Sequence, residues 1–142
     1  MEKRYVVLIF LKDENGKTLL VKRSEKKEFY PGKWTGISGH VENNKPLESA
    51  YRELFEEVGL SKNDIENLEY FENVRIIDHD LNILWIVKPF TAKIKNHSIL
   101  RKSEEIEDYK FFNESEIYEN KELVPGTLEV YEYIKKKRKS KY

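Results

Sequence analysis

Three carboxylates, Glu53, Glu56 and Glu57, stand close together in a segment rich in strong helix formers. Residues three and four apart are neighbours on a helix, so carboxylates at this spacing repel one another. A hard divalent cation such as Mg²⁺ offsets that repulsion, because it takes carboxylate oxygens as ligands. The spacing therefore predicts a metal-binding helix, and the chemistry that such a metal supports is attack of water on phosphorus.

Arg52 precedes this cluster and lies four residues from both Glu48 and Glu56. On a helix it can pair with either carboxylate and hold it in place. Glu53 and Glu57 are then the best pair of metal ligands, and we expect Glu56 to lie between the metal and Arg52 in the catalytic cluster. Glutamates alone are more often part of a solvated helix surface, so the prediction depends on the arginine and on the flanking segments.

The segment around the cluster has the pattern of an amphipathic helix. We expect Asn44 to cap its N-terminus, Pro46 to lie in its first turn and Gly59 to end it in a left-handed conformation. The loop before the helix contains Gly39, whose backbone carbonyl could be a further metal ligand. One side of the helix should pack on a sheet and the other should face a site. The apolar side is formed by Leu47, Ala50, Tyr51, Leu54 and Val58.

The rest of the chain predicts a mixed β-sheet. Asn15-Gly16 is a strong hairpin signal, Asp78-His79-Asp80 predicts a turn between two strands, and a second helix is expected from Leu128 onward. Residues 22–38 are predicted to form a long irregular loop, which in a compact domain is usually functional. This order predicts a single α/β domain over residues 1–142, with helices on both faces of the sheet. Strands are predicted at residues 5–11, 18–21, 69–77, 83–94 and 109–112.

The amino-acid composition limits the possible binding partners and the cellular compartment. Lys plus Arg and Asp plus Glu both number 26, so no overall field favours nucleic acid or a membrane surface as a partner. The absence of cysteine excludes disulfides, thiolate zinc sites and cysteine nucleophiles. No apolar run approaches the roughly 20 residues of a membrane helix, and the apolar N-terminal segment is typical of a strand rather than of a signal peptide. We expect a soluble, cytoplasmic monomer or homodimer with a small-molecule partner.

The run from Gly39 to Leu60 resembles the Nudix box, which reads glycine, five residues, Glu, seven residues, Arg-Glu, an apolar residue, any residue, Glu-Glu, any residue, glycine and an apolar residue. The second half of the box, from Arg52 onward, matches at every specified position. The first half is one residue shorter, and Asn44 stands where the family has glutamate. Residues 19–39 and 104–112 also resemble family members, so the resemblance covers most of the chain.

This resemblance implies a Nudix-type α/β/α sandwich with a mixed β-sheet. It implies hydrolysis of a nucleoside diphosphate linked to another moiety, with Mg²⁺ or Mn²⁺. In many family members a glutamate from a later loop binds metal or serves as general base. Glu105 is our first choice for that role and Glu104 the second, although a solvated acidic loop explains either one equally well. The metal ligands that the resemblance implies are Glu53, Glu56, Glu57 and the carbonyl of Gly39.

Basic and aromatic side chains near the loop before the helix could bind a substrate. Lys22, Arg23 and Lys33 flank the proposed site and could hold phosphates as charged donors, although surface charges need no function. Trp34 is the best candidate to stack on a nucleobase, whereas Trp85 is at least as well suited to core packing. The other aromatic candidates for stacking are Phe29 and Tyr30.

The leading hypothesis is a metal-dependent pyrophosphohydrolase that cleaves a nucleoside triphosphate, damaged ones included, by water attack on phosphorus. Dinucleoside polyphosphates, nucleotide sugars and RNA 5′ ends are alternative substrates for the same chemistry. A non-catalytic nucleotide-binding module of this fold is a second class, which Asn44 keeps open. An isopentenyl diphosphate isomerase is disfavoured, because the mechanism of that family uses a cysteine and this chain has none.

Overall fold

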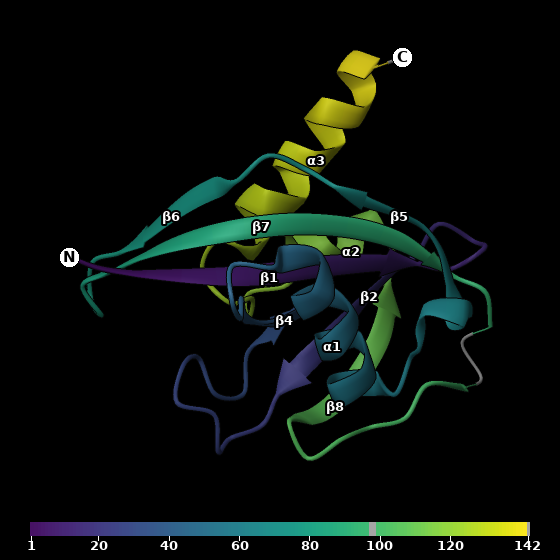
Figure 1. Ribbon diagram of the computed structural model, residues 1–142, viewed down its shortest axis with the longest axis horizontal. Coiled ribbons are helices and arrows are strands. Elements are labelled where there is room, and N and C mark those ends of the chain that lie inside the picture. Colours follow the sequence, from purple (N-terminus) through teal and green to yellow (C-terminus); the bar gives the residue numbers. More distant parts are fainter. Residues whose placement is uncertain (97–98, 142) are drawn as a thin grey trace.

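The computed structural model describes residues 1–96 and 99–141, with the backbone only for residues 139–141. In these residues one mixed sheet of eight strands lies between helices on its two faces (Figure 1). The strands are β1 (Glu2–Lys12), β2 (Thr18–Arg23), β3 (Trp34–Thr35), β4 (Ile37–His40), β5 (Ile65–Tyr70), β6 (Val74–Asp78), β7 (Ile83–Ile94) and β8 (Ile106–Phe112). The helices are α1 (Pro46–Val58), the short 3₁₀ helix η1 (Lys62–Asp64), α2 (Glu114–Glu119) and α3 (Thr127–Lys141).

Strands β1 and β7 form the centre of the sheet. They pair in parallel over the whole length of β1, from Glu2 opposite Ile83 to Lys12 opposite Lys93. The other pairings between the described strands are antiparallel, with β2 and β4 beside β1, and β5 and β6 beside β7. Because β4 pairs with β1 and leads directly into the turn before α1, the first residues of the helix are fixed relative to the sheet.

Two hydrophobic cores lie on the two faces of the sheet. Alternate residues of β1 point to opposite faces, as the period of a strand requires, so Ile9 belongs to one core and Phe10 to the other. Helix α1 covers the first core with the side chains of Ala50, Leu54 and Val58. Helices α2 and α3 cover the second core, and α3 continues beyond the sheet towards the C-terminus (Figure 1). The predicted α/β class, with helices on both faces, is therefore confirmed.

Most of the predicted elements are found. The hairpin forms, with Gly16 at φ 78° in its turn and both the Asn15 and Lys17 amides donating to the Asp13 carboxylate. The predicted strand 83–94 has the observed bounds, and the strands at residues 5–11, 18–21 and 109–112 are longer than predicted. The predicted C-terminal helix is present as α3, and Gly59 ends α1 at φ 75°. Helix α2 was not predicted.

Three predictions of local structure are wrong: a loop, a strand and a helix cap. Residues 22–38 are not one loop, because they contain the end of β2, all of β3 and the start of β4. The predicted strand 69–77 is divided into β5 and β6, which pair with different parts of β7. Asn44 does not cap α1, since Lys45 occupies that position and makes no side-chain capping bond, whereas Asn44 itself has φ 54°.

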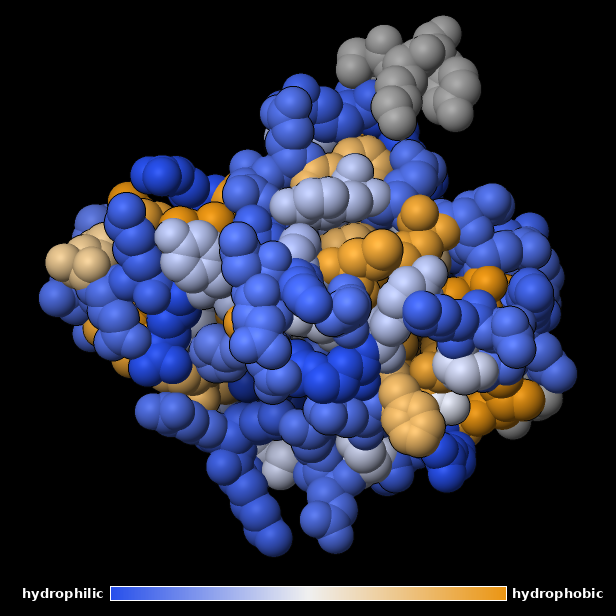
Figure 2. Space-filling view, in the orientation of Figure 1, coloured by the Kyte–Doolittle hydropathy of each residue, from blue (hydrophilic) through white to orange (hydrophobic). Residues whose placement is uncertain are grey.

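The surface in the orientation of Figure 1 is mostly hydrophilic, and its hydrophobic residues form separate small patches (Figure 2). Among the described residues, no helix is both long and apolar enough to cross a membrane. The exposed apolar side chains include Leu47 and Phe55 on α1, of which Leu47 was predicted to face the sheet. The buried stripe of the helix is therefore narrower than its sequence pattern indicates.

Candidate functional site

A cleft of about 390 Å³ lies between the end of β4, helix α1 and the segment that precedes α3. One end is charged, with Arg23, Arg52, Glu53 and Glu105 in its wall. The other end is apolar and aromatic, and it contains Val6, Leu8, Phe29, Ile76, Trp85, Val87, Val124, Pro125 and Val130. A ligand with one strongly anionic part and one flat apolar part would match both ends of this cleft.

Glu53 and Glu57 lie one helical turn apart on the side of α1 that faces β4. Both are buried, with 7% and 4% of their surface exposed, whereas Glu56 on the same turn is exposed. The backbone amide of Ser38 in β4 donates to Oε2 of Glu57 at 3.1 Å. The pair that the sequence singled out is thus held against the sheet, and Glu56 stands at its outer side.

Burial makes both carboxylates costly to ionise. Burial raises the pKa of Glu57 to about 8, with a further rise from the charge of Glu53 and an opposing effect of the Ser38 amide. Burial also raises the pKa of Glu53 to about 7, while the neighbouring Arg52 lowers it and Glu105 raises it. A cation bound between two such buried carboxylates would stabilise their charged forms and offset their mutual repulsion.

Gly39 in β4 lies directly under the Glu53 carboxylate. A Cβ added at Gly39 would stand 2.1 Å from Cδ of Glu53, far inside van der Waals contact. Only glycine therefore lets the Glu53 carboxylate lie over the strand at this point. The structure brings the backbone of Gly39 and this side chain together, as expected from the sequence, and the role of the Gly39 carbonyl as a ligand stays a prediction.

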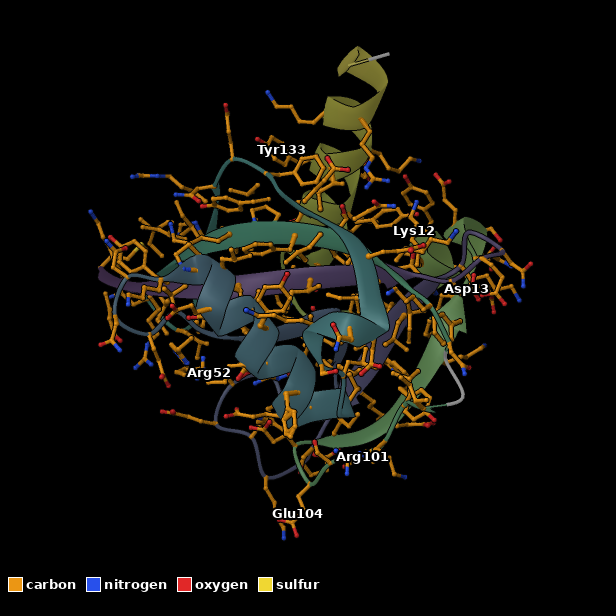
Figure 3. The ribbon with its side chains drawn as sticks, turned by 45° about the vertical axis from the view of Figure 1, so that its right-hand side comes forward. Lys12, Asp13, Arg52, Arg101, Glu104 and Tyr133 are labelled. Carbon is orange, nitrogen blue, oxygen red and sulfur yellow. The ribbon has the colours of Figure 1, made fainter. Side chains whose placement is uncertain are left out.

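Glu105 is the only one of the two later glutamates that reaches the cleft. Its Oε1 accepts a hydrogen bond from Nζ of Lys27 at 3.1 Å, whereas its Oε2 is buried without a hydrogen-bond partner among the described residues. Glu104 is exposed and points away from the body of the molecule (Figure 3). The geometry thus favours Glu105 over Glu104 as the residue that acts at the site.

The segment that carries Glu105 is attached to the end of α1. The backbone amide of Arg101 donates to the carbonyl of Val58 at 3.0 Å, and that of Ser103 donates to the carbonyl of Glu57 at 3.3 Å. These bonds use carbonyls that the end of a helix leaves without intrahelical partners. As a result, the segment that carries Glu105 is fixed to α1, the helix that carries Glu53 and Glu57.

Arg52 does not pair with Glu48 or Glu56 as predicted. Its Nη1 lies 2.7 Å from Oε1 of Glu42, and its Nη2 donates to the carbonyl of His40 at 2.9 Å. The prediction was wrong because helical spacing considers only partners on the same helix, and the turn before α1 supplies a closer carboxylate. Arg52, which is labelled beside α1 in Figure 3, still lines the cleft, and its place in the catalytic cluster stays a prediction.

Of the three basic residues predicted to hold phosphates, only Arg23 lines the cleft. Its Nε donates to the carbonyl of Phe29 at 2.9 Å, and burial lowers the pKa of its guanidinium while Glu57 and Glu105 oppose that effect. Lys22 and Lys33 instead form ion pairs with Glu107 and Glu122, at 3.7 Å and 2.5 Å, outside the cleft wall.

Trp34 packs away from the cleft. Its ring makes an edge contact with Phe112, at 5.3 Å between centroids, in the second hydrophobic core. The indole of Trp85, by contrast, lies in the cleft wall with 7% of the residue exposed. The preference for Trp34 as the stacking residue is therefore not supported by its position, and Phe29 and Trp85, in T-shaped contact at 5.1 Å, are better placed.

A chain of hydrogen bonds that starts at Trp85, at the aromatic end of the cleft, was not predicted from the sequence. Nε1 of Trp85 donates to the hydroxyl of Tyr30 at 2.9 Å, and this hydroxyl donates to the Asp78 carboxylate at 2.5 Å. Burial, together with the hydrogen bond to Asp78, raises the pKa of Tyr30 to about 12. Tyr30 also has φ 53°, an unfavourable conformation for a bulky residue that often marks a functional segment. No local sequence signal links these three residues.

Two further polar groups of the cleft also lacked a sequence signal. Lys27, which pairs with Glu105, was one of many surface-type lysines in the sequence. The hydroxyls of Thr35 and Thr127 lie 2.9 Å apart, buried in the cleft wall, and come from residues far apart in the chain. Only the tertiary fold brings such partners together, so the pattern of neither segment could reveal them.

Within residues 1–96 and 99–141, no three acidic or histidine side chains are already close enough together to form a metal-binding group. The donor set nevertheless fits a hard cation. Glu53 and Glu57 are buried carboxylates with raised pKa values, and Glu105 has a buried oxygen with no hydrogen-bond partner in the described chain. Carboxylate oxygens at the rim of a cleft are the ligands that Mg²⁺ and Mn²⁺ take in proteins.

Comparisons with known proteins agree with this fold. The family model described as NUDIX domain matches residues 2–134. A MutT protein from Methanosarcina mazei has a similar structure, with a TM-score of 0.78 and 20% identity over 97% of this chain and 96% of the other. No curated protein gives a significant match to the sequence.

Two further solved structures are similar over most of their length. The NUDIX domain of Shewanella oneidensis NrtR, solved with ADP ribose, has a TM-score of 0.77 and 16% identity over 96% of this chain and 89% of the other. A MutT NUDIX hydrolase from Burkholderia pseudomallei has a TM-score of 0.75 and 22% identity over 93% of this chain and 98% of the other. At these identities the likeness shows a shared fold.

Proposed function

We propose that this chain, which belongs to the NUDIX domain family and is a hydrolase of phosphoric anhydride bonds, is a Mg²⁺-dependent pyrophosphohydrolase of nucleoside triphosphates. The observation that carries the proposal is the cleft itself. The carboxylates of Glu53 and Glu105 line its charged end, and apolar and aromatic side chains line the other. Such a cleft suits a substrate with one nucleoside and a chain of phosphates.

Glu53 and Glu57 would hold the metal, with Glu56 at the outer side and the carbonyl of Gly39 as a further ligand. Mn²⁺ could replace Mg²⁺ at such a site, because both take oxygen ligands. When bound, the metal neutralises charge that develops on the phosphate oxygens and orients the attacked group. The raised pKa values of Glu53 and Glu57 support this assignment, because a cation would compensate their burial.

Glu105 would act as the general base for the attacking water. Lys27 holds one of its carboxylate oxygens, and the other oxygen is buried and has no partner in the described chain, so it could accept a proton. Arg23 would bind phosphate oxygens, since its guanidinium lines the same end of the cleft. Arg52 would hold the turn before α1, through its bond to the His40 carbonyl.

The nucleoside would lie at the aromatic end, against Phe29 and Trp85. Stacking on an aromatic side chain is worth about 1–3 kcal/mol per base. The paired hydroxyls of Thr35 and Thr127 could donate to or accept from the edge of the base. The aromatic side chains of Phe29 and Tyr30 both contact Trp85, so they form one cluster in the cleft wall, which favours a mononucleotide over a substrate with two nucleosides.

A substrate panel with product identification tests this proposal. Purified protein with Mg²⁺ would be given the natural and oxidised nucleoside triphosphates, ADP-ribose, a diadenosine polyphosphate, a nucleotide sugar and a 5′-triphosphorylated RNA. The proposal predicts that a nucleoside triphosphate has the highest kcat/KM and that turnover requires the metal. Faster cleavage of another substrate would replace the triphosphate assignment. Nucleotide binding without turnover of any of them would favour the non-catalytic module.

A further inference from the structure

Arg52 makes three polar contacts that link the turn before α1 to the proposed metal ligands. Its Nη1 lies 2.7 Å from Glu42, its Nη2 donates to the His40 carbonyl at 2.9 Å, and the same Nη2 lies 3.9 Å from Oε1 of Glu53. Arg52 thus stands between two carboxylates of unequal burial. The Glu42 side chain is 63% exposed and that of Glu53 is 9% exposed.

We propose that Glu42 is a positioning residue, which holds the Arg52 guanidinium away from Glu53 and so leaves the Glu53 carboxylate available to a divalent cation. This inference rests on the proposed metal site. In the sequence the turn is one residue shorter than the family signature, and Asn44 stands in place of its glutamate. In this chain Glu42, two positions earlier, brings a carboxylate to the arginine.

The backbone of the turn is built to place Glu42 there. Asn43 and Asn44 both have φ 54°, a left-handed conformation that asparagine tolerates better than most residues. The Lys45 amide donates to the Glu42 carbonyl at 3.0 Å, which closes the turn. The Glu42 amide in turn donates at 3.0 Å to the hydroxyl of Ser49, a buried residue of α1. Glu42 is therefore fixed through its backbone to the helix that carries Arg52.

The removal of the Glu42 charge has a direct consequence for Glu53. Arg52 would keep its bond to the His40 carbonyl, and its nearest remaining carboxylate would be that of Glu53. A guanidinium that pairs with a carboxylate occupies the oxygens that a cation needs. Arg52 would then compete with the metal, in a partly buried place where solvent screens the attraction poorly.

Direct titration with Mn²⁺, followed by the EPR signal of free Mn²⁺ and without nucleotide, tests the inference. We expect Glu42→Gln to weaken Mn²⁺ binding about 10-fold, as residues that orient metal ligands commonly do, and Glu42→Asp to fall between it and the wild type. Glu48→Gln is the matched control, because Glu48 is an exposed carboxylate in the first turn of α1 and should bind Mn²⁺ like the wild type. Thermal unfolding confirms that each variant is folded.

A double-mutant cycle shows whether Glu42 acts through Arg52. In an Arg52→Gln background, Glu42→Gln should cause no further loss of Mn²⁺ affinity, because the competing guanidinium is absent. A full loss in that background, or an equal loss in Glu48→Gln, would overturn the inference in favour of a general charge effect. If the wild type binds Mn²⁺ and Glu42→Gln binds it equally tightly, this inference alone is overturned. A wild type that binds no Mn²⁺ would overturn the proposed metal site as well.

Discussion

Replacement of Glu57 by glutamine should stabilise the metal-free protein at alkaline pH. A carboxyl whose pKa is raised in the folded state favours folding fully below its unfolded pKa, and this contribution is lost as the pH rises through the folded pKa. For Glu57 that window runs from the ordinary value of 4.5 to about 8. Glu53, with a pKa raised to about 7, has the same sign. The metal-free wild type should therefore become less stable between pH 5 and pH 8.

The size of this effect follows from the shift. One pKa unit corresponds to about 1.4 kcal/mol, so Glu57 alone should cost about 3 kcal/mol of folding free energy between about pH 5 and pH 8. For a chain of 142 residues this corresponds to a fall of roughly 10 °C in Tm. In Glu57→Gln the amide oxygen can still accept the Ser38 bond, and the charge is gone. Its Tm should exceed that of the wild type at pH 8 and equal it near pH 5.

Calorimetry of both proteins with a chelator, and again with excess Mg²⁺, measures this. Mg²⁺ should raise the Tm of the wild type at pH 8 and leave Glu57→Gln almost unchanged, because a ligand stabilises only the folded state that binds it. Glu48→Gln is the control, since that carboxylate is exposed on the same helix. Equal stability of the metal-free wild type at both pH values, or a lower stability of Glu57→Gln at pH 8, would show that burial of Glu57 does not raise its pKa.

Three other substitutions test the site. Glu105→Gln should cut kcat by roughly 100-fold or more and leave Mn²⁺ binding within a few-fold of the wild type, and unchanged turnover would exclude it as the base. Gly39→Ala should abolish metal-dependent turnover, because its Cβ would stand 2.1 Å from Cδ of Glu53 and displace that carboxylate. It should cost little in urea unfolding, because the displaced group is the end of a side chain; wild-type turnover would contradict this role of Gly39. Tyr30→Phe leaves Nε1 of Trp85 without its acceptor, so it should lower the free energy of unfolding by about 1–3 kcal/mol and raise KM for the nucleotide. Unchanged stability and KM would show that Tyr30 does not support the cleft.

The helix and its charged cluster were predictable because their signals are local. The spacing of Glu53 and Glu57 and the left-handed Gly59 depend only on helix geometry, and both are found. The long apolar run of β7 was likewise unambiguous. Short strands gave no such signal: β3 has two residues and β4 has four, so neither shows a period, and residues 22–38 looked like a loop.

The partners of the site residues could not be predicted because they are tertiary. Arg52 was assigned to carboxylates on its own helix, whereas the turn before the helix places Glu42 closer. Lys33 and Trp34 seemed suited to a substrate by residue type, but the fold directs them to Glu122 and to the second core. Residue type and spacing identified the chemistry, and only the fold decided which residues reach the cleft.

Hydrolysis in water labelled with heavy oxygen shows whether a metal-activated water attacks phosphorus at this site. With Mg²⁺ and the best nucleoside triphosphate of the panel, one labelled oxygen should enter a phosphoryl product per turnover. This incorporation should disappear with a chelator and in Glu53→Gln, while Glu48→Gln behaves as the wild type. Label incorporation that persists without metal, or that Glu53→Gln retains at the wild-type rate, would contradict a metal-activated attack of water on phosphorus at this site.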